Sequence, residues 1–241
     1  MTSSKPTVLF CPGGFHLPWV FDSVRGILSS RGFPTEATAL LTVGATDRTI
    51  GMHDDAKNLR SVIEKMAEDG KEIILVGHSY GGLVASNAVE GLGVKQRAAE
   101  GKQGGILVII YLSATVIPAG ANLLADGFIK AKNPLDIFYY GVEPTLAKKA
   151  VEALKPMPSD GLEEESRYEP WNQGIDVGYV FTTEDRTIPI SAQQAMASRF
   201  PDGYFSASIV SGHSPFFTNP DDVADAIQNA LECVRKKTLL N

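Results

Sequence analysis

A serine in a glycine-rich turn is the first residue of this sequence whose surroundings suit chemistry. Ser79 lies in a Gly-His-Ser-Tyr-Gly run, after an apolar, β-branched stretch (73–76) and before apolar residues at helical spacing (83–89). Strand, sharp turn and helix form a nucleophile elbow, in which a serine with a strained backbone projects from the strand end. Only glycine leaves room two residues before and after such a serine, and Gly77 and Gly81 occupy those positions. Ser79 is therefore the candidate nucleophile.

A serine hydroxyl needs a histidine as base and a carboxylate that orients the histidine. In the elbow arrangement the acid follows the serine and the histidine comes last, each after a strand. His213 follows the strand-like run 204–210 and is the candidate base. Asp185 follows the run 175–182 and is the candidate acid, because it lies later in the turn than the competing Glu184. We interpret the other candidate carboxylates as solvated or capping groups: Asp54, Asp55, Asp160 and Asp176.

Acyl transfer also needs two main-chain N–H groups that bind the developing oxyanion. One is expected from Tyr80, directly after the serine, where the helix N-terminus adds a favourable dipole. The other is expected from Gly14, in the Pro-Gly-Gly loop after the first strand. Phe15, His16 and Ser214 are expected beside the substrate pocket, although the sequence leaves open whether His16 lines the pocket or braces the loop.

Alternating strand-like and helix-like segments must position these residues. Strands are predicted over 7–11, 33–40, 73–76, 106–112, 175–182 and 204–210. Helices are predicted over 19–31, 54–69, 190–200 and 220–236, together with the segment after the elbow. The basic, glycine-rich stretch 95–105 is interpreted as a connection. This alternation predicts an α/β fold with a mostly parallel sheet, helices on both faces, and all strand-to-helix loops at one edge.

The segment 115–171 departs from this alternation and is interpreted as a small helical cap. It contains helix-like pieces at 121–131 and 145–154, and an aromatic cluster at 138–140 that suits either a core or a substrate wall. The predicted organisation is thus a single core domain, 1–114 and 172–241, with the cap inserted into it.

Motifs spread over nearly the whole chain resemble the α/β-hydrolase superfamily. They occur in the expected order: Pro12-Gly13-Gly14, Gly77-His78-Ser79-Tyr80-Gly81, Thr183-Glu184-Asp185 with Ile188-Pro189, and Gly212-His213. The resemblance implies the α/β-hydrolase fold and a Ser-His-Asp triad. Pro12 is a departure, since loops of this kind often begin with His-Gly.

Within the superfamily, the chain resembles the branch of plant methyl-ester esterases and hydroxynitrile lyases, which many microbial and fungal hydrolases also resemble. The motifs that indicate this branch are Phe15-His16, Ser113-Ala114 with Pro118, and Leu154-Lys155-Pro156. Lyases of the branch have a lysine directly after the catalytic histidine, which stabilises the cyanide leaving group. Ser214 occupies that position here, which argues against lyase activity.

Composition narrows the possible partners. The chain has 241 residues, a net charge of −6 and 44% hydrophobic residues, with no apolar run of the length that spans a bilayer. We therefore expect neither a nucleic-acid partner nor a membrane association.

The start of the sequence lacks the pattern of a signal peptide, and Cys11 and Cys233 need not pair, so a cytoplasmic location is expected. The four histidines show no metal-ligand spacing, and no cofactor or metal is implied.

These observations predict a serine hydrolase that cleaves a carboxylic ester or lactone of a small, mostly apolar molecule. One alternative is an acyltransferase or lactone-forming enzyme, in which the acyl group passes to an acceptor other than water. Another alternative is a ligand receptor of the same fold with little turnover. The sequence leaves the oligomeric state open, with a homodimer as one option.

Overall fold

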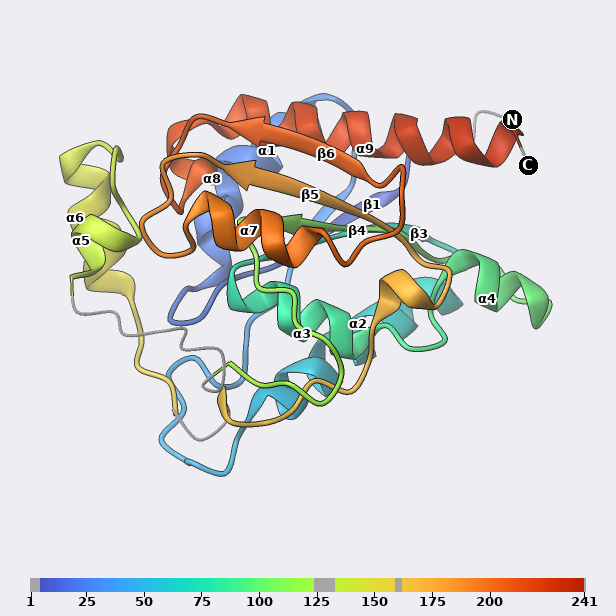
Figure 1. The fold of residues 1–241 in the computed structure, drawn as a ribbon, viewed down its shortest axis with the longest axis horizontal. Coiled ribbons are helices and arrows are strands. Elements are labelled where there is room, and N and C mark those ends of the chain that lie inside the picture. Colours follow the sequence, from blue (N-terminus) through green and yellow to red (C-terminus); the bar gives the residue numbers. More distant parts are fainter. Residues whose placement is uncertain (1–4, 124–132, 159–161, 241) are drawn as a thin grey trace.

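Six parallel strands form one sheet at the centre of the molecule (Figure 1). The computed structural model describes residues 5–123, 133–158 and 162–240. The strands are β1 (Thr7–Cys11), β2 (Thr35–Ala37), β3 (Glu72–His78), β4 (Gly105–Leu112), β5 (Asp176–Thr182) and β6 (Phe205–Ile209). Their order is β2-β1-β3-β4-β5-β6, and each neighbouring pair is parallel. The carboxyl ends of all six strands therefore meet at one edge, where the candidate residues follow β1, β3, β5 and β6.

Alternation along β1 shows why both faces of the sheet are covered. Val8 and Phe10 point into one apolar cluster, whereas Leu9 and Cys11 point into the other. The first cluster includes η1 (Pro18–Phe21), α1 (Asp22–Ser30), α8 (Pro215–Thr218) and α9 (Pro220–Leu240). The second includes α2 (Met52–Glu68), α3 (Tyr80–Ala88) and α7 (Ile190–Ala197). The predicted α/β fold, a parallel sheet with helices on both faces, is confirmed.

Two segments of the core differ from the sequence-based expectation. The stretch predicted as a connection contains a short helix, α4 (Val94–Ala99), which is held by the buried guanidinium of Arg97. That group donates hydrogen bonds to the carbonyls of Ala67, Gln103 and Gly104. The predicted strand 33–40 is shortened to the three residues of β2, an edge strand that pairs only with β1.

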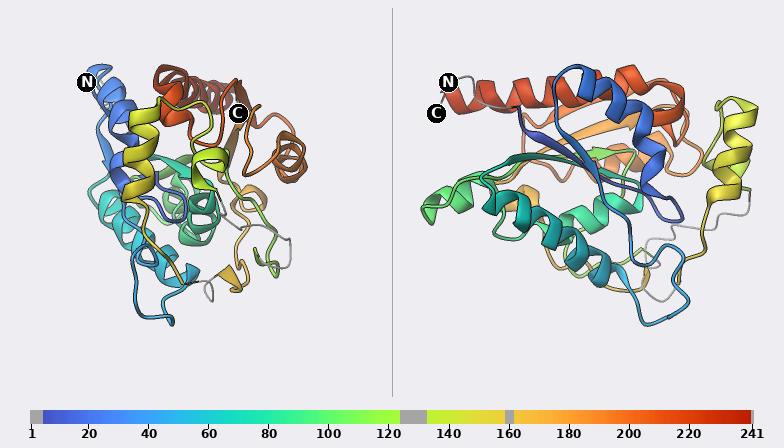
Figure 2. Two further views of the ribbon diagram at one scale, coloured as in Figure 1. Left: turned by 90° about the vertical axis from the view of Figure 1, so that its left-hand side faces the viewer. Right: turned by 180° about the vertical axis from the view of Figure 1, so that it is seen from behind.

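Residues 115–171 contribute α5 (Pro134–Ile137), α6 (Pro144–Ala153) and η3 (Pro170–Asn172). Figure 1 and the right-hand view of Figure 2 place α5 and α6 beyond the carboxyl ends of the strands. The helix predicted over 145–154 corresponds to α6. Of the helix predicted over 121–131, residues 121–123 are not helical and the rest lies outside the described residues.

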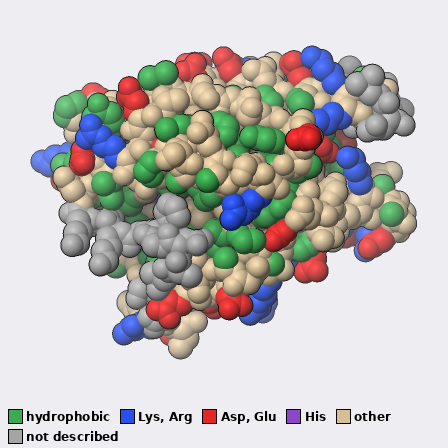
Figure 3. All heavy atoms as spheres, in the orientation of Figure 1, with side chains coloured by type: hydrophobic (Ala, Val, Ile, Leu, Met, Phe, Trp, Pro, Cys, Tyr) green, Lys and Arg blue, Asp and Glu red, His purple; other side chains and the backbone are tan. Residues whose placement is uncertain are grey.

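The surface shown in Figure 3 has acidic and basic side chains interspersed among neutral ones. Among the helices of the described residues, none combines the length and the apolar character needed to cross a membrane.

Candidate active site

The turn between β3 and α3 has the geometry of a nucleophile elbow. Ser79 has φ 52° and ψ −127°, a strained conformation for a residue with a side chain. Its N–H donates to the carbonyl of Leu112 at the end of β4 (3.3 Å), and its carbonyl accepts from Thr115 (3.0 Å). The strained residue is thus held by the neighbouring strand end.

The glycines of the elbow permit a very close packing of main-chain segments. A Cβ on Gly77 would lie 2.7 Å from the carbonyl oxygen of Gly81, in the first turn of α3. A Cβ on Gly81 would lie 2.4 Å from the carbonyl oxygens of Cys11 and Pro12. The second contact brings the elbow against the end of β1, so that Ser79 and the Pro-Gly-Gly loop are neighbours.

His213 and Asp185 are in direct contact. The Nδ1 atom of His213 lies 2.8 Å from Oδ2 of Asp185, and both side chains are buried. The carboxylate can only accept, so Nδ1 carries the proton and Nε2 is left as the basic nitrogen. Nε2 is buried and has no hydrogen-bond partner among the described residues. Glu184, the competing acid, is exposed, while its main-chain N–H donates to the carbonyl of Ser211 (3.0 Å) and ties the two turns together.

The sequence analysis missed the residues that hold the Asp185 carboxylate. Oδ1 accepts the main-chain N–H groups of Thr187 (2.7 Å) and Ile188 (2.8 Å), and Oδ2 accepts the hydroxyl of Thr182 (3.0 Å). Gln193 is fully buried in α7 and bonds both the N–H of Thr182 (3.0 Å) and the carbonyl of Ile188 (2.7 Å). These bonds fix the carboxylate in one orientation.

Three of the four histidines form a buried group at the same edge. The ring of His78 lies 4.8 Å from that of His213 and 6.0 Å from that of His16 (centroid distances). Nε2–H of His78 donates to the main-chain carbonyl of His213 (2.9 Å), which secures the loop that follows β6. Burial lowers the pKa of His78 well below 6.5, and the neighbouring rings of His213 and His16 lower it further. Burial likewise lowers the pKa of His16 to about 4, so both rings are neutral at pH 7.

The two predicted oxyanion donors lie next to each other. A Cβ on Gly14 would be 3.8 Å from the Cβ of Tyr80. The N–H groups of Gly14 and Tyr80 donate to no other group in the described part of the chain. Tyr80 begins α3, so its N–H is among the free donors at a helix N-terminus.

Apolar side chains border the loop and the base. Phe138 stacks on His213 (centroids 5.8 Å apart, planes inclined by 30°) and lies 6.2 Å from the ring of Phe15. The sulfur of Met157 lies 2.9 Å from the position of a Cβ on Gly14. Phe138 therefore borders His213 and also belongs to a small apolar cluster with Tyr139, Ala147 and Ala150. Met157 is a neighbour of the loop that the sequence did not indicate.

The other two predicted pocket residues are buried. Ser214 lies beside His213 as the residue before α8, and its hydroxyl has no partner among the described residues. His16 is also buried, and both of its ring nitrogens are hydrogen-bonded. Of the two roles left open for His16, bracing the loop is the one that its contacts fit.

The interpretation of Asp55 as a solvated or capping carboxylate is wrong. Asp55 is 1% exposed and accepts hydrogen bonds from the N–H (3.0 Å) and hydroxyl (2.6 Å) of Thr42 and from the hydroxyl of Tyr80 (3.0 Å). Burial raises its pKa above the ordinary value despite these bonds. The capping role belongs to Asp54, whose carboxylate accepts the N–H of Gly51. Asp55 instead fixes the side chain of one oxyanion candidate, Tyr80.

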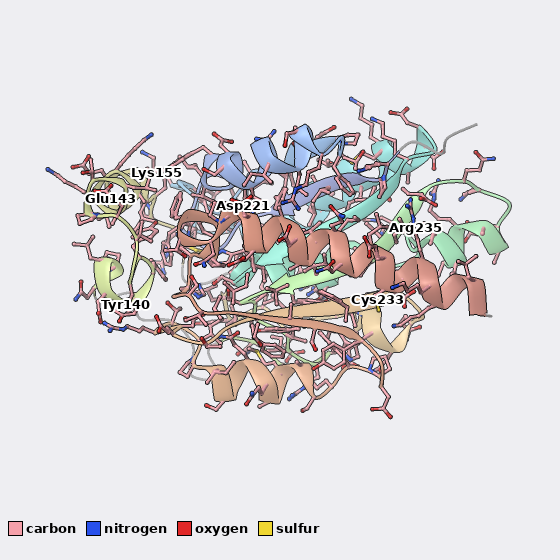
Figure 4. All side chains as sticks on the ribbon, turned by 90° about the horizontal axis from the view of Figure 1, so that it is seen from above. Tyr140, Glu143, Lys155, Asp221, Cys233 and Arg235 are labelled. Carbon is pink, nitrogen blue, oxygen red and sulfur yellow. The ribbon has the colours of Figure 1, made fainter. Side chains whose placement is uncertain are left out.

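The α5 segment is attached directly to the turn that contains Asp185. Arg186 forms an ion pair with Asp136 and stacks over the ring of Tyr140, 3.4 Å from its centroid. The hydroxyl of Thr187 donates to the carbonyl of Ile137 (2.8 Å). Figure 4 labels Tyr140 at the end of the molecule where α5 and α6 lie. Two adjacent residues of the turn, Arg186 and Thr187, thus anchor the inserted segment.

No group of three histidine, cysteine or acidic side chains suited to a metal ion occurs among residues 5–123, 133–158 and 162–240.

Comparison with known proteins identifies similar chains. Residues 8–226 match the alpha/beta hydrolase family. The alpha/beta hydrolase nvfD of Aspergillus novofumigatus is 25% identical over 244 residues, covering 94% of this chain and 96% of that protein. A putative chloroplastic methylesterase 13 of Arabidopsis thaliana is 26% identical over 257 residues, covering 92% of this chain and 55% of that protein.

A similar fold is found among solved structures. The crystal structure of the methylesterase MES16 from Arabidopsis aligns with a TM-score of 0.76 and 19% identity, over 94% of this chain and 99% of that one. At this identity the likeness concerns the fold.

Proposed function

The chain belongs to the alpha/beta hydrolase family, and from this premise we propose that it hydrolyses a carboxylic ester or lactone through an acyl-enzyme on Ser79. The observation that carries the proposal is the bond between Nδ1 of His213 and Asp185 (2.8 Å). It leaves Nε2 as the basic nitrogen, without a partner among the described residues, at the sheet edge that also presents Ser79. Esterase-type relatives support ester hydrolysis in general.

The proposed mechanism assigns one task to each residue. Nε2 of His213 accepts the proton of Ser79 as its Oγ attacks the ester carbonyl, and Asp185 stabilises the imidazolium that forms. The N–H groups of Gly14 and Tyr80 bind the oxyanion of the tetrahedral intermediate. The imidazolium then protonates the leaving alcohol, which departs as the acyl-enzyme forms. In the second half, His213 activates a water molecule that releases the acid and frees Ser79.

The proposed substrate is small and mostly apolar. Phe15, Phe138 and Met157 border the oxyanion loop and the base, and all three are neutral. We propose methyl esters as the first class to examine, because relatives of this chain are named methylesterases. Residues 115–171 act, in this proposal, as the cap whose α5 segment closes the site against the turn at Arg186.

The experiment is a hydrolysis panel with wild type and Ser79→Ala. The panel contains p-nitrophenyl esters from acetate to octanoate, aryl methyl esters and several lactones. A fluorophosphonate probe, followed by peptide mass spectrometry, locates the reactive serine. We expect hydrolysis and probe labelling in wild type, both lost in Ser79→Ala.

A matched control replaces Ser198, an exposed serine directly after α7, with alanine and should leave both readings unchanged. Hydrolysis that persists in Ser79→Ala would contradict the proposal. Labelling of Ser79 without hydrolysis of any panel member would also contradict it, and would favour acyl transfer to an acceptor other than water.

A further inference from the structure

The loop that follows β1 has three consecutive carbonyls, each of which accepts a hydrogen bond. The carbonyl of Gly13 accepts the main-chain N–H of His16 (3.2 Å) and closes a four-residue turn. The carbonyl of Gly14 accepts Nδ1–H of the His16 ring (2.7 Å). The carbonyl of Phe15 accepts the N–H of Lys155 (3.0 Å), which follows α6 and is labelled in Figure 4.

These bonds determine which way the amide groups of the loop face. The described peptide bonds are trans, so the C=O and N–H of each peptide unit point in opposite directions. With the Gly13 carbonyl directed to His16, the Gly14 N–H faces away from His16. The turn also holds Phe15 at φ 68°, a strained value that persists only where surrounding contacts impose it.

The ring of His16 is itself oriented from the inserted segment. Because Nδ1 donates to a carbonyl, the neutral ring has Nε2 as an acceptor. The hydroxyl of Tyr139 lies 2.9 Å from Nε2 and donates to it. Both side chains are 2% exposed, so water does not readily replace either bond. The pKa of His16, lowered by burial to about 4, keeps this pattern of donors and acceptors at neutral pH.

We propose that Tyr139 and His16 are positioning residues for the oxyanion site. Tyr139 orients the His16 ring, and the ring holds the Gly14 carbonyl, while the main-chain N–H of His16 holds the Gly13 carbonyl. Both peptide units that flank Gly14 are thus fixed, and its N–H is presented to the substrate. This inference rests on the proposed function, since it concerns the same oxyanion. It gives the inserted segment a role in the chemical step, in addition to enclosing the substrate.

Two substitutions separate this role from simple packing. Tyr139→Phe removes only the hydroxyl and leaves Nε2 of His16 buried and unpartnered. His16→Phe removes both hydrogen bonds of the ring, to the Gly14 carbonyl and to the Tyr139 hydroxyl. His16→Asn keeps a donor close to the position of Nδ1. Loss of one oxyanion donor lowers kcat by about 10²-fold to 10³-fold. We expect a decrease in kcat of that order for His16→Phe and of about tenfold for Tyr139→Phe. His16→Asn should recover part of the activity that His16→Phe loses.

The readings are kcat and KM for p-nitrophenyl acetate, and the affinity for an alkyl boronic acid that forms a tetrahedral adduct with serine. Positioning predicts that kcat and boronate affinity fall together while KM changes less than about threefold, because the donor acts on the tetrahedral state rather than on the bound ester. The matched control is Tyr168→Phe, which removes a tyrosine hydroxyl from the same segment where it contacts Gln96. Thermal melting of each variant confirms that it is folded.

Ser79-dependent hydrolysis in wild type is established first, so that each outcome has one meaning. If wild type hydrolyses the ester and Tyr139→Phe matches Tyr168→Phe in kcat and boronate affinity, the positioning role is overturned and the proposed function stands. A folded His16→Asn as inactive as His16→Phe, or a change confined to KM, overturns it too. If wild type shows no Ser79-dependent reaction, the proposed function fails and this inference fails with it.

Discussion

Replacing Asp185 with asparagine should disable the proposed base, His213, although the side chain keeps the same number of heavy atoms. Oδ1 of Asp185 accepts two main-chain N–H groups, from Thr187 and Ile188. In Asp185→Asn an acceptor must stay at that position, so the amide nitrogen takes the place of Oδ2 and faces Nδ1 of His213. Two donors cannot share that contact, and His213 must move its proton from Nδ1 to Nε2.

The size of the effect follows from this exchange of tautomers. With a proton on Nε2, His213 cannot accept the proton of Ser79, and the catalytic contribution of the base is lost. Loss of the orienting carboxylate in a serine–histidine–aspartate site lowers kcat by about 10⁴-fold, or about 5 kcal/mol in the activation free energy. The fold should survive, because the side-chain volume is conserved and Gln193 still bonds the main chain of the turn.

The assay is kcat/KM for p-nitrophenyl acetate at pH 7 to 9, with circular dichroism and thermal melting of the same samples. The matched control is Glu184→Gln, which neutralises the exposed neighbouring carboxylate and should retain nearly full activity. The reasoning is refuted if folded Asp185→Asn stays within about tenfold of wild type, or if Glu184→Gln loses as much activity.

Three further predictions concern stability and reactivity. Gly77→Ala places a Cβ 2.7 Å from a main-chain oxygen and should lower the unfolding free energy by about 1–3 kcal/mol in urea titrations. At Gly26 in α1 a Cβ would meet nothing within 4 Å, so Gly26→Ala should raise the unfolding free energy by about 0.5–1 kcal/mol. Equal effects at the two positions would contradict the packing argument. Burial raises the pKa of Asp55 above its ordinary value of 3.8, so the folded protein binds this proton more tightly than the unfolded chain does. The stability of wild type relative to Asp55→Asn should therefore decrease as the pH rises from below 3.8 through the folded-state pKa, and urea titrations that show the opposite slope would exclude the assignment. Burial also raises the pKa of the Cys11 thiol, whereas Cys233 is partly exposed on α9. A disulfide reagent should therefore modify Cys233 quickly in the native protein, and should modify no thiol quickly in Cys233→Ser.

Local patterns were sufficient for the fold and for the order of the candidate residues. The elbow around Ser79 and the alternation of strands with helices depend on near neighbours, and both appear in the structure. The resemblance to plant methylesterases is confirmed by the relatives found. Boundaries at the sheet edge were less accurate, as at β2, because a single pairing partner sets their length.

Contacts between distant segments were not predictable in the same way. Tyr139 and His16 are 123 residues apart, and nothing in either local pattern indicates that they meet. The sequence does contain an indication that Asp55 and Gln193 are buried. Each lies on the apolar face of its helix, since Asp55 precedes Leu59 by four residues and Gln193 precedes Ala197 by four. A polar side chain at such a position must find partners when its helix docks, and both residues do.

The distribution of the site over the sheet has a consequence for how the protein gains activity. Ser79 follows β3, which lies in the middle of the sheet, whereas Asp185 and His213 follow β5 and β6, the last two strands in the chain. During synthesis the serine emerges more than a hundred residues before the histidine. A partly folded chain that contains only the first strands therefore has the proposed nucleophile without the proposed base. In refolding experiments, recovery of esterase activity should report the docking of β6 at the edge of the sheet, and should follow the recovery of helix content rather than coincide with it.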